Sequence, residues 1–266
     1  TVFNVGQSTV TWYLLESQNL NFVYSTCTFQ VDVQSSRALV YIPNVNSGNV
    51  SAVDPVTSTL MATIPVGTNP ADTKMSPDGS KVYVANRGSN TVSVIQTATN
   101  TVVATLPVGN FPSALCVNTN GTRLYVVNQL SNSVSVINTL NNALMATVAV
   151  GTGPTRIVVT PDGSKVYVLN TASGNVSVID ASTNISVATV AVGSVSNSIT
   201  MSPDGKRVYV SNFSTGNISV INTTTNAVVA TVGMGAGTAF VVVLITEMLP
   251  QMPYLRPYRP SLLRHL

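Results

Sequence analysis

The sequence predicts an all-β fold of repeated four-stranded sheets, and two observations support this prediction. The first is a strict period: a Tyr, an Asn and a Gly each recur every 42 residues along most of the 266-residue chain. The second is that each copy holds short apolar runs separated by turn residues. A period of about 40–45 residues with several strands per copy is typical of β-propeller blades. The repeated tyrosines are Tyr41, Tyr83, Tyr125, Tyr167 and Tyr209.

One copy, residues 110–151, shows how a blade is encoded. The runs SALCVN, RLYVVN, SVSVIN and ALMATVAV predict four antiparallel strands, separated by polar turns. Three other copies carry SPDG or TPDG at the first turn, where Pro presets φ and Gly adopts positive φ. The strands are apolar on both faces, so each sheet needs a neighbour on each side. Radial stacking provides both neighbours without long exposed edges.

The chain ends predict a closed ring. Residues 1–25 align with strands two to four of a blade, and residues 236–248 align with a first strand, so together they would form one split closing blade. The five intact copies lie between them at 26–67, 68–109, 110–151, 152–193 and 194–235. We therefore expect one domain of six blades over residues 1–248, or else part of a seven-bladed ring. The Pro- and Arg-rich tail, 249–266, is expected to be irregular, and the chain is interpreted as a segment of something longer.

Composition argues against nucleic acid as the partner. The net charge of +3 is located in the tail, at Arg256, Arg259 and Arg264, and the body is neutral. A body without excess positive charge does not follow a phosphate backbone. No run approaches the roughly 18 apolar residues of a membrane span, and we expect a monomer without a transmembrane segment.

The motif YV-x-N, followed by VSVI and a VG-x-x-P link, resembles the YVTN-repeat β-propeller family. The resemblance covers residues 26–240. It implies a prokaryotic protein that is extracellular, at the cell surface or periplasmic, because the family includes surface-layer and exported proteins of bacteria and archaea. The repeated residues build blades, so the resemblance specifies the fold and not the ligand.

Variable positions on the first strands are the first group of candidate ligand-binding residues. We expect these strands to line the central channel, and their charged residues are Asp32, Asp72, Lys74 and Arg156. Asp32 and Lys74 stand at one level on adjacent blades, which predicts either an ion pair or a polar patch for a small ligand. Arg156 has no acidic residue at its level and is the better ligand candidate.

The second group lies in the loops at one end of the blades. Its members are Arg87, Phe111, Gln129 and Phe213. Exposed aromatic residues beside an Arg are suited to binding a protein, peptide or glycan. The alternative is that each aromatic ring covers the end of the core.

Catalytic groups are sparse, and no cofactor, metal site or catalytic residue is predicted. The only histidine, His265, lies in the tail, which excludes a Ser-His-Asp arrangement within the ring. The leading hypothesis is a non-catalytic binding or scaffold module that acts through its loop face. The alternative is a propeller lyase or lactone hydrolase at the channel mouth, and the third is a single-stranded nucleic-acid binder.

Overall fold

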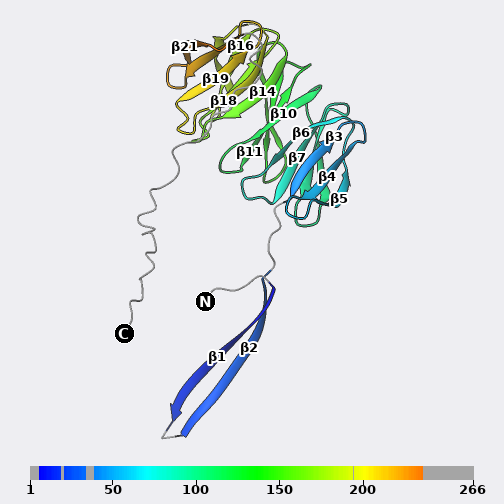
Figure 1. The fold of residues 1–266 in the computed structure, drawn as a ribbon, viewed down its shortest axis with the longest axis vertical. Coiled ribbons are helices and arrows are strands. Elements are labelled where there is room, and N and C mark those ends of the chain that lie inside the picture. Colours follow the sequence, from blue (N-terminus) through cyan, green and yellow to red (C-terminus); the bar gives the residue numbers. More distant parts are fainter. Residues whose placement is uncertain (1–5, 19–20, 34–38, 194, 236–266) are drawn as a thin grey trace, which may run out of the picture.

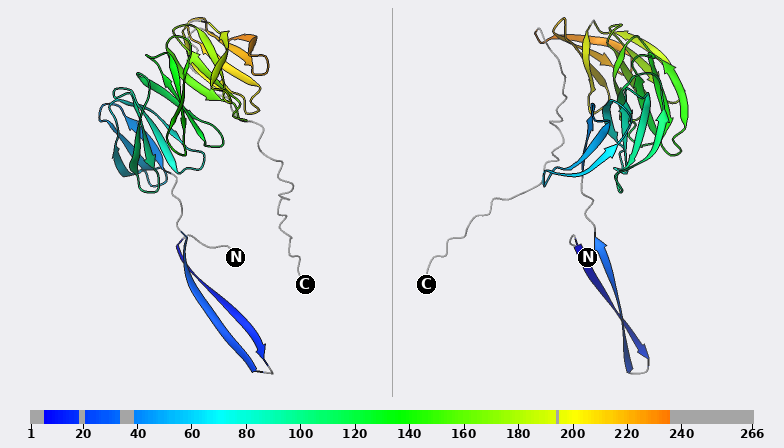
Figure 2. Two further views of the ribbon diagram at one scale, coloured as in Figure 1. Left: turned by 180° about the vertical axis from the view of Figure 1, so that it is seen from behind. Right: turned by 90° about the vertical axis from the view of Figure 1, so that its right-hand side faces the viewer.

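The computed structural model describes residues 6–18, 21–33, 39–193 and 195–235. Every regular element in these ranges is a β-strand, and the strands form six sheets. Five of the sheets follow one another in an arc from β3 to β21 (Figure 1, Figure 2). These five sheets are β-propeller blades, numbered I to V here in chain order. The predicted all-β propeller fold is confirmed.

The strands of each blade run in chain order from the inside of the arc to its outside. Blade I contains β3 (Val40–Asn44), β4 (Asn49–Asp54) and β5 (Thr59–Pro65). Blade II contains β6 (Pro70–Met75), β7 (Lys81–Asn86), β8 (Thr91–Gln96) and β9 (Thr101–Pro107). Blade III contains β10 (Pro112–Val117), β11 (Arg123–Asn128), β12 (Ser133–Asn138) and β13 (Leu144–Ala149). Blade IV contains β14 (Pro154–Val159), β15 (Lys165–Asn170), β16 (Asn175–Asp180) and β17 (Ile185–Ala191). Blade V contains β18 (Ser196–Met201), β19 (Arg207–Asn212), β20 (Asn217–Asn222) and β21 (Ala227–Gly233).

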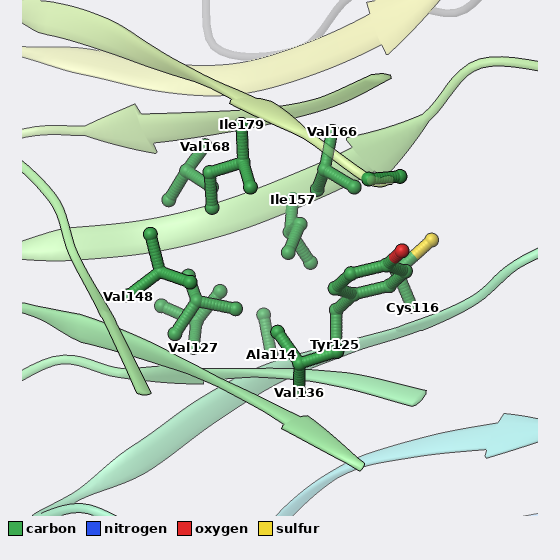
Figure 3. Close-up of a cluster of buried hydrophobic side chains, with 12 residues drawn as sticks. Ala114, Cys116, Tyr125, Val127, Val136, Val148, Ile157, Val166, Val168 and Ile179 are labelled. Atoms are coloured by element: carbon green, nitrogen blue, oxygen red, sulfur yellow. The ribbon is translucent and has the colours of Figure 1, made fainter. Parts of the chain in front are cut away.

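The hydrophobic core lies between blades. Successive side chains of a strand point to opposite faces of its sheet, so each blade contributes to two apolar clusters. The cluster between blades III and IV joins Tyr125, Val136 and Val148 to Ile157 and Val168 (Figure 3). Equivalent clusters fill the other three junctions of the arc. This repeated burial explains why the central strands are apolar at nearly every position.

The repeated Gly and Asn of the motif are packing partners. A Cβ atom at Gly109 would lie 2.7 Å from the Asn128 side chain, so only glycine fits there. Asn128 in turn donates from Nδ2 to Ser135 Oγ at 2.9 Å. Gly109 thus packs the link between blades II and III against Asn128, and Asn128 in turn joins β11 to β12 within blade III.

Basic residues also tie each blade to the next one. Lys81 Nζ donates to the carbonyl of Thr139 at 2.8 Å, and Lys165 Nζ donates to the carbonyl of Thr223 at 2.6 Å. Arg123 makes the corresponding bond to the carbonyl of Ala181. Three of the basic residues of the neutral body thus connect neighbouring blades through hydrogen bonds.

The N-terminal segment differs from its expected pairing. β1 (Gly6–Gln18) and β2 (Asn21–Val33) form a separate two-stranded sheet, with Val31 opposite Ser8. β2 contains the residues expected to form the inner strand of blade I, which has three strands in the described part of the chain. The expected first strand of the closing blade, 236–248, lies outside the described residues. Closure into six blades, or into seven, therefore stays a prediction.

No helix in the described ranges is long and apolar enough to cross a membrane.

Candidate binding site at the loop face

The loop face is the end of the arc at which strands two and three, and successive blades, are connected. Arg87, Phe111, Gln129 and Phe213 all lie there, as expected. We define this face by its loops, which are residues 45–48, 66–69, 87–90, 108–111, 129–132, 150–153, 171–174, 192–195 and 213–216. The turn face is the opposite end, where the SPDG and TPDG turns lie.

One position of the loop face has a left-handed backbone in all four blade-to-blade links. Its φ values are 50° at Asn69, 58° at Phe111, 62° at Gly153 and 55° at Val195. The carbonyl of this residue accepts the N–H of the first residue in the neighbouring loop, as from Gln129 to Phe111 at 3.0 Å. The link therefore needs this conformation whatever side chain it carries.

Phe111 occupies this position at an energetic cost. Asn and Gly adopt positive φ readily, whereas for a bulky residue the left-handed region costs about 1–2 kcal/mol. The Phe111 side chain is only partly buried, so part of the ring remains accessible to a partner. Backbone strain of this kind clusters at binding and catalytic sites.

Arg87 and Phe111 form a stacked pair. The guanidinium carbon of Arg87 lies 5.0 Å from the centre of the Phe111 ring, within the range of a cation–π interaction. Arg87 Nε is buried and has no hydrogen-bond partner. The Phe111 N–H donates to Asn90 Oδ1 at 2.9 Å, which fixes the loop that carries the ring.

The structure thus brings three of the four loop candidates together. Arg87 and Phe111 are in contact, and Gln129 is joined to Phe111 through the backbone bond described above. Phe213 lies on blade V, two blades further along the arc, where 43% of its surface is exposed. It belongs to the same face but not to the same cluster.

The inner strand β10 presents its side chains to the neighbouring blades. Ala114 and Cys116 of β10 lie in the core between blades III and IV (Figure 3), whereas Leu115 and Val117 pack between blades II and III. Side chains stand perpendicular to a sheet, and neighbouring blades pack face to face. The expectation that these positions line the channel is therefore wrong for Ala114 and Cys116.

Asp72 is part of this inter-blade contact. Its Oδ2 accepts the N–H of Leu115 at 2.8 Å, and its Oδ1 accepts the N–H of Thr73 at 3.0 Å. Burial raises the pKa of the Asp72 carboxyl above its usual value, against the opposing effects of the Leu115 N–H and of Lys74 and Arg156. Both carboxylate oxygens are thus engaged with the backbone.

Lys74 and Arg156 are exposed on the inner strands. Arg156 Nη1 donates to the carbonyl of Thr155 at 3.1 Å, which is a contact with its own strand. Asp32 lies in β2 opposite Gln7, and its side chain is outside the described part of the structure. The Asp32–Lys74 pair therefore stays a prediction.

The described residues contain no group of three or more His, Cys, Asp or Glu side chains that could hold a metal ion.

The sequence analysis did not predict the left-handed backbone at residue 111, although the other repeat copies contain a signal for it. Asn69 and Gly153 stand at the same repeat position, and both residue types tolerate positive φ. Phe111 and Val195 are bulky residues at a position that Asn and Gly fill in the other two links, and this contrast marks backbone strain at both.

Comparison with known proteins supports the fold. A family model described as "Lactonase, 7-bladed beta-propeller" matches residues 18–143, which is less than half of the chain. No curated protein matches the sequence.

Solved structures show the same architecture. Hydrazine synthase of Kuenenia stuttgartiensis aligns with a TM-score of 0.64 at 23% identity, over 70% of this chain and 60% of that one. The dihydro-heme d1 dehydrogenase NirN, solved in complex with DHE, aligns with a TM-score of 0.64 at 20% identity, over 75% of this chain and 44% of that one. A putative 6-phosphogluconolactonase from Bacteroides uniformis aligns with a TM-score of 0.62 at 19% identity, over 78% and 71%. The chain thus spans 60% or less of the first two structures, and identities this low show the fold alone.

Proposed function

We propose that this chain is a non-catalytic β-propeller that binds a partner through its loop face, in an extracellular or cell-envelope setting. The observation that supports it is the strained, partly exposed Phe111 stacked against Arg87. An aromatic side chain that costs stability at its own position and stays partly exposed is suited to a contact outside the chain. The setting rests on the resemblance of the YV-x-N motif to exported propellers.

The blade interiors support a scaffold role for the rest of the molecule. The repeated Tyr, Gly and basic residues hold one blade to the next, which leaves the variable loop residues as the candidates for binding on this face. Aromatic and Arg side chains supply most of the energy in protein interfaces. The Arg87–Phe111 pair provides both residue types in one contact.

The experiment is a binding screen on glycan and peptide arrays with the wild-type chain and two variants. Phe111→Asn removes the aromatic ring and keeps a residue suited to positive φ, and Asp162→Asn is the control on the opposite face. We expect at least one ligand whose binding falls tenfold or more with Phe111→Asn and is unchanged with Asp162→Asn. Ligands that respond equally to both variants, or to neither, would contradict the proposal.

The second candidate is a lactone hydrolase, favoured by the match to the lactonase propeller model over residues 18–143. The hydrogen bonding of Asp72 argues against a lactone hydrolase, because both of its carboxylate oxygens accept backbone hydrogen bonds. Incubation with 6-phosphogluconolactone and with simple aliphatic lactones distinguishes the two candidates. Hydrolysis that disappears in Asp72→Asn would establish the enzyme and reject the binding module.

A further inference from the structure

The two ends of the blades differ in charge. Among the described loops of the loop face, Arg87 is the only charged residue and no Asp or Glu occurs. The turn face carries both signs, with Asp78, Asp162 and Asp204 in its turns and Lys81, Lys165, Lys206 and Arg207 beside them. A lone positive charge on an otherwise uncharged face attracts an anionic group. An anionic ligand that binds the loop face is therefore expected to place its charge on Arg87.

The guanidinium of Arg87 lacks a counter-ion within the loop face. The Phe111 ring offers it only a cation–π contact. A planar guanidinium binds a carboxylate through two parallel hydrogen bonds. A carboxylate is therefore the ligand group that best matches the Arg87 guanidinium.

The surroundings of the pair are polar but uncharged. Asn69 and Asn90 flank it, and Ser131 accepts the N–H of Asn110 beside Phe111 at 2.7 Å. Amide and hydroxyl groups of this kind pair with ligand hydroxyls, and each can act as donor or acceptor. An aromatic ring adds an apolar surface for the C–H face of a sugar.

A groove lies nearby on blade III, against β12, β13 and the link that contains Gly109. It has a volume of about 580 Å³ and is lined by Gly109, Ser131, Asn132, Leu144 and Thr147, among others. It contains no charged residue. The bond between Asn110 and Ser131 joins the groove to the Arg87–Phe111 pair. An oligomeric ligand with its charged unit on Arg87 has room to extend into the groove.

We propose that the loop face binds an acidic oligosaccharide, with the carboxylate of a uronate-type sugar on Arg87 and the adjoining sugar ring against Phe111. This inference rests on the proposed binding function and adds the ligand class. A peptide fits less well, because the groove offers short polar side chains and Leu144 but no deep apolar pocket for peptide side chains. A neutral glycan leaves Arg87 without its counter-ion.

The test uses the full chain and three immobilised polymers. Polygalacturonate carries the sugar and the carboxylate, its fully methyl-esterified form carries the sugar alone, and polyglutamate carries the carboxylate alone. We expect binding to polygalacturonate that weakens tenfold or more on esterification and with Arg87→Gln. Phe111→Asn should weaken it similarly, whereas Val195→Asn, at the same link of another blade, should not.

The outcomes separate the ligand class from the binding function. Equal binding to the esterified polymer, lost with Phe111→Asn, would overturn the acidic ligand and leave the loop-face function standing. Binding to polyglutamate as tight as to polygalacturonate would also overturn the saccharide. Absence of polygalacturonate binding at millimolar sugar would reject the inference, and arrays on which no ligand responds to Phe111→Asn would reject the function too.

Discussion

The hydroxyl of Ser196 donates a hydrogen bond to Oδ1 of Asn212 at 2.7 Å, within blade V. In blades II, III and IV a proline replaces this serine, and the corresponding Oδ1 atoms of Asn86, Asn128 and Asn170 are buried without a partner. One substitution in the repeat therefore satisfies an acceptor that its sister blades leave unpaired.

Removal of this hydroxyl is expected to destabilise the fold. Ser196→Ala leaves Asn212 Oδ1 buried and unpaired, which costs about 1–3 kcal/mol. Chemical denaturation measures the loss in the free energy of unfolding. Ser198→Ala, two residues along the same strand, is the control and should change stability by less than about 0.5 kcal/mol. Equal effects of the two variants would contradict this role of Ser196.

Acid is expected to destabilise the protein through its turn aspartates. The Ser76 hydroxyl and the Ser80 N–H lower the pKa of Asp78 to about 2, and the Ser182 hydroxyl and nearby N–H groups lower that of Asp180 to about 2. An unfolded Asp has a pKa of about 3.9. A lowered native pKa contributes stability that is present above pH 4 and is lost as the pH falls from about 4 to about 2.

Melting temperatures at pH 5, 3 and 2 measure this loss. The Asp78→Asn, Asp180→Asn double variant is the control and should have a flatter decline, because it no longer takes up those protons. A variant that declines as steeply as the wild type would show that other groups cause the acid sensitivity.

The buried Cys116 thiol is expected to be unreactive in the native state. Burial raises its pKa, and only 7% of its surface is exposed, so thiolate is scarce and inaccessible at neutral pH. In a Cys27→Ser background, labelling with a disulfide reagent should be at least a hundredfold slower in buffer than in denaturant. Rapid native labelling would show that the junction between blades III and IV opens.

The predicted closing strand can be tested through blade V. Tyr209 and Ile218 are partly exposed there, whereas their equivalents Tyr167 and Val176 are fully buried under the next blade. Val241 lies outside the described residues, at the repeat position of the buried Leu115. If residues 238–243 cover blade V, Val241→Asp buries an unpaired charge.

We expect Val241→Asp to cost about 3 kcal/mol of unfolding free energy. Val229→Asp, at an outer-strand position that is 52% exposed, is the matched control and should cost little. Equal and small effects of both substitutions would rule out a covering strand at 238–243.

The repeat made the blades predictable. The runs at 123–128 and 133–138 coincide with β11 and β12, because alternation and turn residues fix local structure within one copy. The direction in which Cys116 points was not predictable in this way, since it depends on how two blades face each other. The pairing of residues 21–33 also differed, because an apolar strand can pair with more than one partner.

The sequence predicted which residues belong to the candidate site, but not which of them lie in contact. Arg87 and Phe111 were selected as variable loop residues, yet they are far enough apart in the sequence that only the folded loops show the stack. The positive φ of Phe111 follows from the link between blades, which all four links share, and no single copy reveals it.

The most direct test of the account is the stability of Phe111→Asn measured together with its binding. Relief of the left-handed strain predicts a gain of about 1 kcal/mol in unfolding free energy, accompanied by loss of binding at the loop face. Val195→Asn, with the same backbone conformation, should gain stability and keep its binding. A Phe111→Asn variant that is less stable than the wild type and still binds would show that the ring serves the core, and would contradict the account.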